Sequence, residues 1–489
     1  MGWKDAAAPV LTRVPAVRQP EGHVPFKRKL AWTAGILLMY FFLTGVSLFG
    51  LGSQGGDFYG QFRSILAGSS GSILQLGIGP IVTASIVLQL LGGANLLGLD
   101  TDNNPRDQVL YQGLQKVLVV AMVFLTGIPM VFFSNALPPS QALAQSLGVG
   151  LVGVQLLIFA QMAVGGLLIL FMDEVVSKWG VGSGIGLFIV AGVSQQLVAG
   201  LFGLESLTQN SGFFPTWIGI LTGARDLPGS PLTSEGFSAI VFGQGQLLAM
   251  VTTVLIFVVV VYAESVRIEI PLSHARVKGA RGKFPVKLIY ASVLPMILVR
   301  ALQANLQFLG QILSSQWQAM PTWLGQYGQN GQPTGGLFYY LAPIQSPGQW
   351  MWWTGAPTAE TWQILIRVSV DLSFMIVGGA VFAIFWVETT GMGPESTAQQ
   401  IQDSGMQIPG FRRNPAVIEK VMERYIPQVT VIGGALVGLL AVLANMLGTI
   451  GAVSGTGLLL TVSITYKLYE EIAEEQLMEM HPMMRQMFG

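Results

Sequence analysis

The sequence predicts an all-α polytopic membrane protein with about ten transmembrane helices. Two observations support this class. Hydrophobic residues make up 51% of the 489 residues and charged residues only 10%, whereas a soluble domain carries about a quarter charged residues. Apolar runs of about 20 residues, the length that crosses a bilayer as a helix, recur along the chain. They lie at 30–50, 72–92, 112–134, 149–171, 184–203, 240–262, 288–312, 363–387, 428–448 and 452–470.

The distribution of Lys and Arg predicts how these spans are oriented. Cations cluster in residues 1–29 and in the loops 264–287 and 388–427, whereas 135–148 and 313–361 have none. Because cytoplasmic loops are enriched in Lys and Arg, we expect both termini to be cytoplasmic. Residues 1–29 lack the pattern of a signal peptide, so we expect the first span to be retained.

The stretch between the first two spans has an unusual pattern. Residues 58–67 are too short to span, and glycines lie on both sides of them. One helical face of this segment is apolar; it consists of Phe58, Phe62, Ile65 and Leu66, with Arg63 elsewhere on the helix. Broken helices persist at membrane depth only where they are buried or line a cavity. The residues alone leave two interpretations open, a re-entrant plug helix or an external loop.

Five of the predicted spans precede residues 204–239 and five follow them. This arrangement suggests two inverted five-helix halves, as in some transporters. The predicted division is a cytoplasmic N-terminal segment 1–29, a first half 30–203, an extracellular hinge region 204–239, a second half 240–470 and a cytoplasmic tail 471–489.

Two long cytoplasmic loops carry recognisable local patterns. Within 264–287, alternating apolar and polar residues predict a basic β-hairpin, with Gly279 and Gly282 allowing the turn. Within 388–427, Asn414 and Pro415 predict the start of a helix that runs through Arg424.

The cations of these loops have two possible roles. They can simply hold the loops in the cytoplasm, or they can dock an acidic partner such as RNA phosphate or an acidic protein surface. The candidate docking residues are Arg267, Arg276, Lys278, Arg281, Lys283, Arg412 and Arg413.

Three ionisable residues fall within predicted spans: Arg300, Arg367 and Asp371. Such residues are functional candidates by default. Arg367 and Asp371 are four positions apart, so we expect them to pair within one helix. One aspartate is little support for the carboxylate network of a transporter, and we interpret the three as structural or as lining a funnel.

Several kinds of chemistry are excluded. The chain has no Cys, and none of its three His residues lies in an apolar run, so disulfides, thiolate nucleophiles and a His-based intramembrane site are ruled out. The apolar runs offer no midplane Lys for a Ser–Lys dyad, and no phosphate-binding loop motif occurs. We therefore expect no enzymatic activity, no cofactor and no metal site.

Four sequence strings resemble the archaeal form of the SecY family, the large subunit of the Sec protein-translocation channel. They are LGIGPIVTASIVLQLL at 76–91, GVGSGIGLFI at 180–189, PGFR at 409–412 and GTGLLL at 455–460. The resemblance covers nearly the whole chain. It implies two inverted halves hinged between the fifth and sixth spans, and it implies that residues 58–67 are a plug.

The resemblance also implies functional residues. A pore ring is expected from Ile78, Val82, Ile185, Ile189, Ile297 and Leu460. Converging aliphatic side chains exclude ions by dewetting. Thr83 and Asn305 match polar positions of a lateral gate between the second and third spans on one side and the seventh and eighth on the other.

The implied function is a passive channel that passes secretory polypeptides across the plasma membrane and releases membrane-protein helices into it. The implied partners are SecE/gamma-type and beta-type single-span small subunits, the ribosome and the signal-recognition pathway, translocating polypeptides and membrane lipids. The alternative is a secondary transporter of a small solute, suggested by the broken helices and the repeat, although an apolar midplane argues against it.

Overall fold

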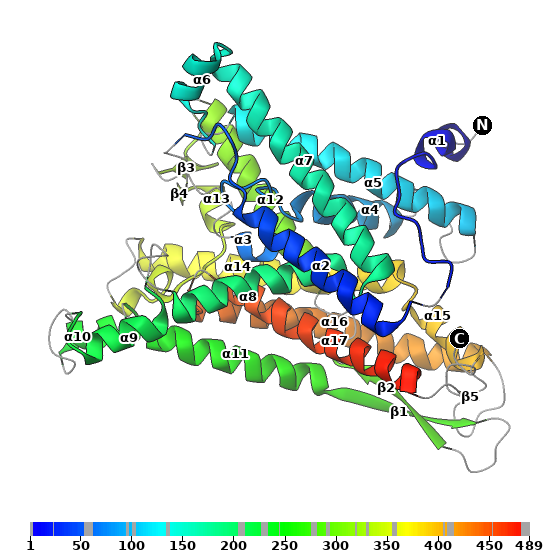
Figure 1. The fold of residues 1–489 in the computed structure, drawn as a ribbon. Helices are drawn as coiled ribbons and strands as arrows, with labels where there is room; N and C mark the ends of the chain where they lie inside the picture. The colour runs from blue at the N-terminus through cyan, green and yellow to red at the C-terminus, as the bar shows by residue number, and fades with distance from the viewer. Residues whose placement is uncertain are drawn as a thin grey trace.

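The computed structural model describes residues 3–480 except 23, 53–61, 94–96, 100–103, 134–136, 204–210, 226–232, 244, 275–280, 290–293, 318–319, 329–331, 355–358, 404–405, 408–414 and 452. The described chain is mostly helical (Figure 1). Ten of its long helices correspond to the ten predicted spans. They are α2 (Phe26–Gly45), α4 (Gly79–Gly93), α5 (Pro105–Ile128), α7 (Gly150–Trp179), α8 (Gly184–Phe202), α11 (Leu247–Ser265), α12 (Leu294–Gln316), α14 (Thr361–Thr389), α16 (Pro415–Leu447) and α17 (Gly455–Met480).

Seven helices within the described residues are long and apolar enough to cross a membrane. Of the others, α4 is shorter, whereas α2 begins and α17 ends with charged residues. This confirms the predicted all-α polytopic class. The division into domains with the boundaries given above stays a prediction.

The ninth long helix differs from its prediction. It begins at Pro415, as expected, but continues past Arg424 and through Pro427 to Leu447. An interior proline removes one helical hydrogen bond and crowds the carbonyl four residues earlier, but α16 packs on α14 both before and after Pro427. Gly379 of α14 and Gly434 of α16 approach so closely that a Cβ on Gly379 would lie 2.5 Å from the Gly434 carbonyl oxygen. This packing holds the helix together across the proline.

The long helices fall into two sets that meet at few places. Helices α2, α4, α5, α7 and α8 precede residues 204–239, and α11, α12, α14, α16 and α17 follow them. The sets contact each other through α4 with α12 and α14, and through α17 with α2 and α8. In Figure 1, α5 and α7 lie at one side of the molecule and α11 at the other.

The predicted cytoplasmic hairpin is confirmed. Strand β1 (Arg267–His274) pairs antiparallel with β2 (Arg281–Lys287), with Arg267 opposite Lys287. Gly282 lies within β2 opposite Leu272 rather than in the turn. Strand β5 (Met406–Gln407), which comes from the second long loop, pairs with the other edge of β1. The two cytoplasmic loops are therefore joined in one sheet, which extends beyond α11 in Figure 1.

Short elements complete the described structure. They are α1 (Trp3–Leu11), α3 (Arg63–Leu66), the π-helical turn η1 (Pro129–Phe133), α6 (Gln141–Leu147), α9 (Phe213–Leu221), α10 (Ser234–Val241), α13 (Leu337–Tyr340), η2 (Pro347–Gln349), η3 (Trp352–Thr354), α15 (Pro394–Asp403), and the hairpin β3 (Gln326–Tyr327) with β4 (Pro333–Gly335). Helices α9, α10 and α15 lie in stretches for which the sequence analysis predicted no helix.

Candidate functional site

The short helix α3 lies inside the bundle. The side chains of its N-cap residue Phe62 and of Ile65 and Leu66 are 4%, 2% and 5% exposed, as their spacing on one face predicts. The helix packs against α8, α12 and α17, so helices from both halves surround it. An external loop would not be buried in this way. Phe58 lies outside the described residues, and Arg63 is half-buried.

Hydrogen bonds hold the C-terminal end of α3 in its buried position. The Leu66 carbonyl oxygen accepts from the backbone N–H of Ile78 at 2.8 Å. The next carbonyl, that of Ala67, accepts from the Tyr40 hydroxyl at 2.9 Å. Tyr40 is itself buried and stacks on Phe188 of α8, with ring centroids 5.1 Å apart. The sequence analysis missed Tyr40, because no local pattern relates it to a segment 27 residues away.

Gly77 allows the chain to return against the end of α3. Its φ is +53°, a conformation that residues with a Cβ rarely adopt. A Cβ at this position would lie 2.1 Å from the Leu66 carbonyl oxygen and 2.7 Å from the Gly68 nitrogen. Only glycine fits here, and it places Ile78 directly beside α3.

The six predicted ring residues belong to, or pack against, the hydrophobic cluster that also contains Ile65 and Leu66 of α3. Ile78, Val82, Ile189, Ile297 and Leu460 are buried, and Ile185 is partly buried against the same hydrophobic cluster. Ile185 and Ile189 belong to α8, Ile297 to α12 and Leu460 to α17. These three helices are the ones that α3 contacts, and Ile78 is hydrogen-bonded to α3 directly. Helix α3 therefore contacts the three helices that carry four of the predicted ring residues, and the ring assignment itself stays a prediction.

The predicted polar gate pair is in contact. Asn305 of α12 donates from Nδ2 to Oγ1 of Thr83 of α4 at 3.0 Å, and the Thr83 hydroxyl donates to the Gly79 carbonyl oxygen at 2.9 Å. The bond therefore crosses the seam between the two halves. A polar contact of this kind between membrane helices contributes only about 0.6 kcal/mol on average and about 2 at most.

Two protein-family models together match residues 38–469 of the chain. A family model described as SecY matches residues 72–469, and a model of the plug domain of Sec61p matches residues 38–71. The chain belongs to the SecY family. The protein translocase subunit SecY of Haloferax volcanii is 77% identical to it over 490 residues, covering 100% of both chains. That of Halobacterium salinarum is 73% identical, covering 100% of this chain and 99% of its own.

Solved structures of the SecY family are similar to this chain over nearly its full length. A structure of a protein-conducting channel is 36% identical, has a TM-score of 0.78, and is matched over 97% of this chain and 98% of its own. Sec61 in the canine ribosome-channel complex from the endoplasmic reticulum is 36% identical over the same shares, with a TM-score of 0.75.

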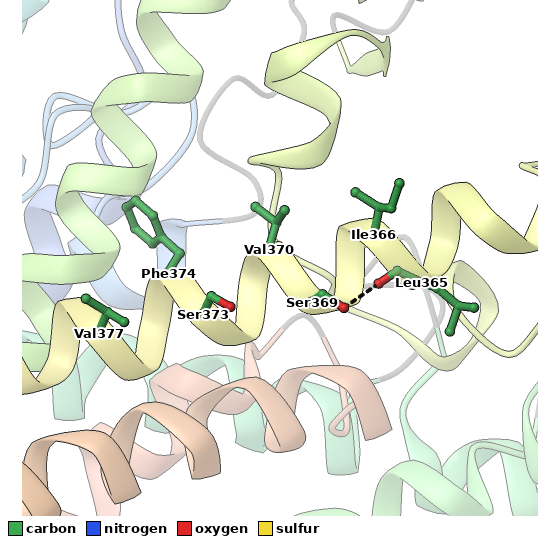
Figure 2. Close-up of a pocket in the computed structure, with 7 residues that line it drawn as sticks. All are labelled: Leu365, Ile366, Ser369, Val370, Ser373, Phe374 and Val377. Atoms are coloured by element: carbon green, nitrogen blue, oxygen red, sulfur yellow. Dashed lines mark hydrogen bonds between the residues drawn. The ribbon is translucent and has the colours of Figure 1, made fainter.

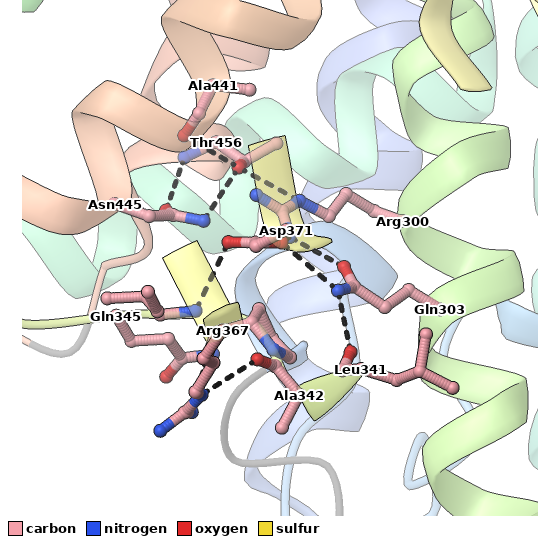
Figure 3. Close-up of polar contacts among 12 residues, drawn as sticks. Arg300, Gln303, Leu341, Ala342, Gln345, Arg367, Asp371, Ala441, Asn445 and Thr456 are labelled. Atoms are coloured by element: carbon pink, nitrogen blue, oxygen red, sulfur yellow. Dashed lines mark hydrogen bonds and ion pairs between the residues drawn. The ribbon is translucent and has the colours of Figure 1, made fainter. Parts of the chain in front are cut away.

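The ionisable residues within the spans of this chain pair differently from the prediction. Asp371 does not pair with Arg367 of its own helix. Its cation is Arg300 of α12, with Nη1 3.6 Å from Oδ1 (Figure 3). Arg367 donates instead to the carbonyl oxygens of Ala342 and Pro343. Because Arg300 and Asp371 are both 1% exposed, they line no open funnel.

The structure describes only some of the candidate docking cations in the two cytoplasmic loops. At the base of the hairpin, Arg267 donates from Nη2 to Oε1 of Glu470 of α17 at 3.0 Å, and Lys287 pairs with the other oxygen of that carboxylate. Arg267 therefore anchors the hairpin, which the sequence analysis did not predict. The side chains of Arg281 and Lys283, and all of Arg276, Lys278, Arg412 and Arg413, lie outside the described part.

A shallow hollow lies along the exposed side of α14 (Figure 2). It measures about 610 Å³ and is lined by Leu365, Ile366, Ser369, Val370, Ser373, Phe374 and Val377. The Ser369 hydroxyl already donates to the Leu365 carbonyl oxygen at 2.8 Å. With no ionisable group in its lining, the hollow gives no support to a transporter site for a charged solute.

Proposed function

We propose that this chain conducts unfolded polypeptides through the place where α3 and the six ring residues meet, and that α3 seals this pore at rest. The chain is the pore-forming subunit of a protein translocation channel, a multi-pass protein of the plasma membrane and not an enzyme. The observation that carries the sealing role is the position of α3, which is buried against α8, α12 and α17.

The proposed seal acts by excluding water and ions. Aliphatic side chains that converge in a narrow passage present no partner for a hydrated ion, so the passage empties of water. The same side chains make no strong directional bonds, and they can part around a polypeptide. Because the hydrogen bond between Thr83 and Asn305 is neutral, the α4–α12 seam is a suitable lateral exit for an apolar helix.

The proposed partners follow from the relatives and the cytoplasmic sheet. Single-span small subunits of the SecE/gamma and beta types complete the channel, and the ribosome docks on its cytoplasmic face. The likeness to Sec61 in a ribosome-channel complex supports ribosome docking. The joining of both basic loops by β1 and β5 supports a single docking surface.

A crosslinking experiment tests the path of the polypeptide. The chain has no native Cys, so Ile297→Cys introduces a single thiol. We expect this thiol to form a disulfide with a Cys in a translocation intermediate stalled in proteoliposomes. The matched control is Val258→Cys on α11, a side chain that is 57% exposed on the outside of the bundle. Equal crosslinking at the two positions, or none at Ile297→Cys, would show that the polypeptide takes another path.

A charge-reversal experiment tests ribosome docking. We expect Arg276→Glu, Lys278→Glu and Arg281→Glu together to weaken ribosome binding severalfold, measured by cosedimentation. The loss should be larger at low salt, because exposed charges are screened within about 8–10 Å at ordinary ionic strength. Reversal of Arg13 and Arg18, two exposed cations of the N-terminal segment, serves as the control. If ribosome affinity stays at the wild-type value, the loop cations serve only membrane topology.

A further inference from the structure

We infer that a buried polar network centred on Arg300 positions the ring helix α12 against α14, α16 and α17, and thereby fixes its ring residue Ile297 relative to Leu460 of α17. The inference rests on the proposed function, because it takes the ring to seal that channel. Arg300 is in this sense a positioning residue for the ring.

Arg300 connects three helices. Its Nη1 donates to Oε1 of Gln303 at 2.6 Å, on α12 itself, and lies 3.6 Å from Oδ1 of Asp371 on α14. Its Nε donates to Oγ1 of Thr456 on α17 at 3.2 Å. The guanidinium is planar and its N–H groups are fixed in direction. Contacts with two other helices at once therefore restrict how α12 can rotate and slide.

The partners of Arg300 are themselves held. Thr456 and Asn445 of α16 bond reciprocally, with Thr456 N donating to Oδ1 at 2.9 Å and Nδ2 donating to Oγ1 at 3.0 Å. Gln303 Nε2 donates to Oδ1 of Asp371 at 3.2 Å and to the Leu341 carbonyl oxygen at 3.0 Å. Figure 3 shows these groups converging between the helices. The network thus joins α12 to three helices of the second half.

The network lies close to the ring along the chain. Ile297 precedes Arg300 by three positions on α12, and Leu460 follows Thr456 by four on α17. Each of these separations is about one helical turn. A change in the contact between Arg300 and Thr456 therefore shifts two ring residues relative to each other. Such a shift would open a gap in a seal that depends on side-chain contact.

The attachments on the two sides of α12 are unequal. Toward α14 and α17 it has a buried ion pair and a charged hydrogen bond, and bonds with an ionised partner are roughly twice as strong as neutral ones. Toward the first half its bonds are neutral. Asn305 donates to Thr83 of α4, and Ser315 and Gln316 donate to the Phe133 carbonyl oxygen of η1. The charged contacts of α12 therefore all lie on the side of the second half, and they fix its position relative to α14 and α17.

Net stabilisation explains the network less well than positioning does. Removing two charges from water costs about as much free energy as their attraction returns, so apolar replacement of a buried pair is often neutral. In addition, Arg300 Nη2 is buried without a hydrogen-bond partner among the described residues, which makes the arrangement less favourable than a saturated one. Fixing the rotation and translation of α12 does not require a net gain in stability.

The test uses the double variant Arg300→Met, Asp371→Leu in the channel assembled with its small subunits. Replacing both partners leaves no unpaired buried charge. We expect normal assembly, a resting ion conductance severalfold above wild type in planar bilayers, and severalfold better transport of a substrate with a weakened signal sequence. Wild-type conductance and wild-type selectivity in this variant would overturn the inference, whatever the change in thermal stability.

Arg367→Met is the matched control. Like Arg300, Arg367 is a buried arginine, and it lies on α14 one turn before Asp371. Its hydrogen bonds go to Ala342 and Pro343 rather than to α12. We expect it to leave conductance and selectivity unchanged; an effect equal to that of the double variant would contradict a specific role for Arg300. Should the double variant not assemble, Thr456→Val, which removes the acceptor of the Arg300 Nε–H, decides by the same two measurements.

A single ring variant separates this inference from the proposed function. Ile297→Ser should leak if the ring seals the pore. If it leaks and the network variants do not, the positioning role of Arg300 is wrong and the channel function stands. If Ile297→Ser does not leak, the ring assignment itself is wrong.

Discussion

Replacing Ile78, Val82 and Ile297 together with serine is expected to raise the resting ion conductance of the channel in planar bilayers manyfold. The three side chains are at most 2% exposed and belong to the same hydrophobic cluster as Ile65 and Leu66 of α3. Serine hydroxyls bond water, so the passage would no longer dewet at rest. The altered channel should still insert, because the three residues occupy a small part of the apolar surface of their helices.

Loss of stability could mimic this result, and the control addresses it. Truncating a buried Ile or Met to a small residue costs about 2–5 kcal/mol. Serine at Ile158, Met162 and Ile169 of α7, all fully buried and none of them a predicted ring residue, imposes a similar cost. We expect this second triple variant to melt at a lower temperature without leaking. Equal leak from both would show that loosened packing, rather than the ring, sets the conductance.

The membrane spans were predictable because their length and apolar character are local properties. The fifth span, predicted at 184–203, is a helix at Gly184–Phe202. The same reasoning fails for helical turns that contain charged residues. Helix α2 begins at Phe26, before the predicted start at 30, and Lys29 in its first turn is paired with Glu475 of α17. A hydropathy pattern sees the charge of Lys29 but not its distant partner.

The candidate site likewise combines local features, which the sequence predicts, with contacts between distant residues, which it does not. The apolar face of Phe62, Ile65 and Leu66 could be recognised from spacing, and burial confirms it. The Thr83–Asn305 contact joins residues 222 positions apart, and only the family resemblance predicted that they meet. The pairing of Asp371 was predicted wrongly, because the i,i+4 rule considers one helix at a time. Its actual partner, Arg300, lies on a different helix.

Gly77→Ala is expected to unseat α3 and to open the channel to ions at rest. The new Cβ would lie 2.1 Å from the Leu66 carbonyl oxygen, closer than any non-bonded contact, and alanine at this positive φ adds about 1–2 kcal/mol of strain. The net free energy that holds α3 in its buried position is also small. Burying each of three apolar side chains contributes about 1.5–3 kcal/mol, while ordering the backbone costs about 1–2 kcal/mol per residue.

Gly79→Ala is the matched control, two positions further along the same string. A Cβ at Gly79 would meet only the end of the Leu66 side chain, at 3.9 Å, which is ordinary contact. We expect this channel to stay tight and selective, whereas Gly77→Ala should leak and should transport substrates with weakened signal sequences. If Gly77→Ala is as tight and as selective as Gly79→Ala, the seating of α3 does not seal the pore, and the ring alone must hold back ions.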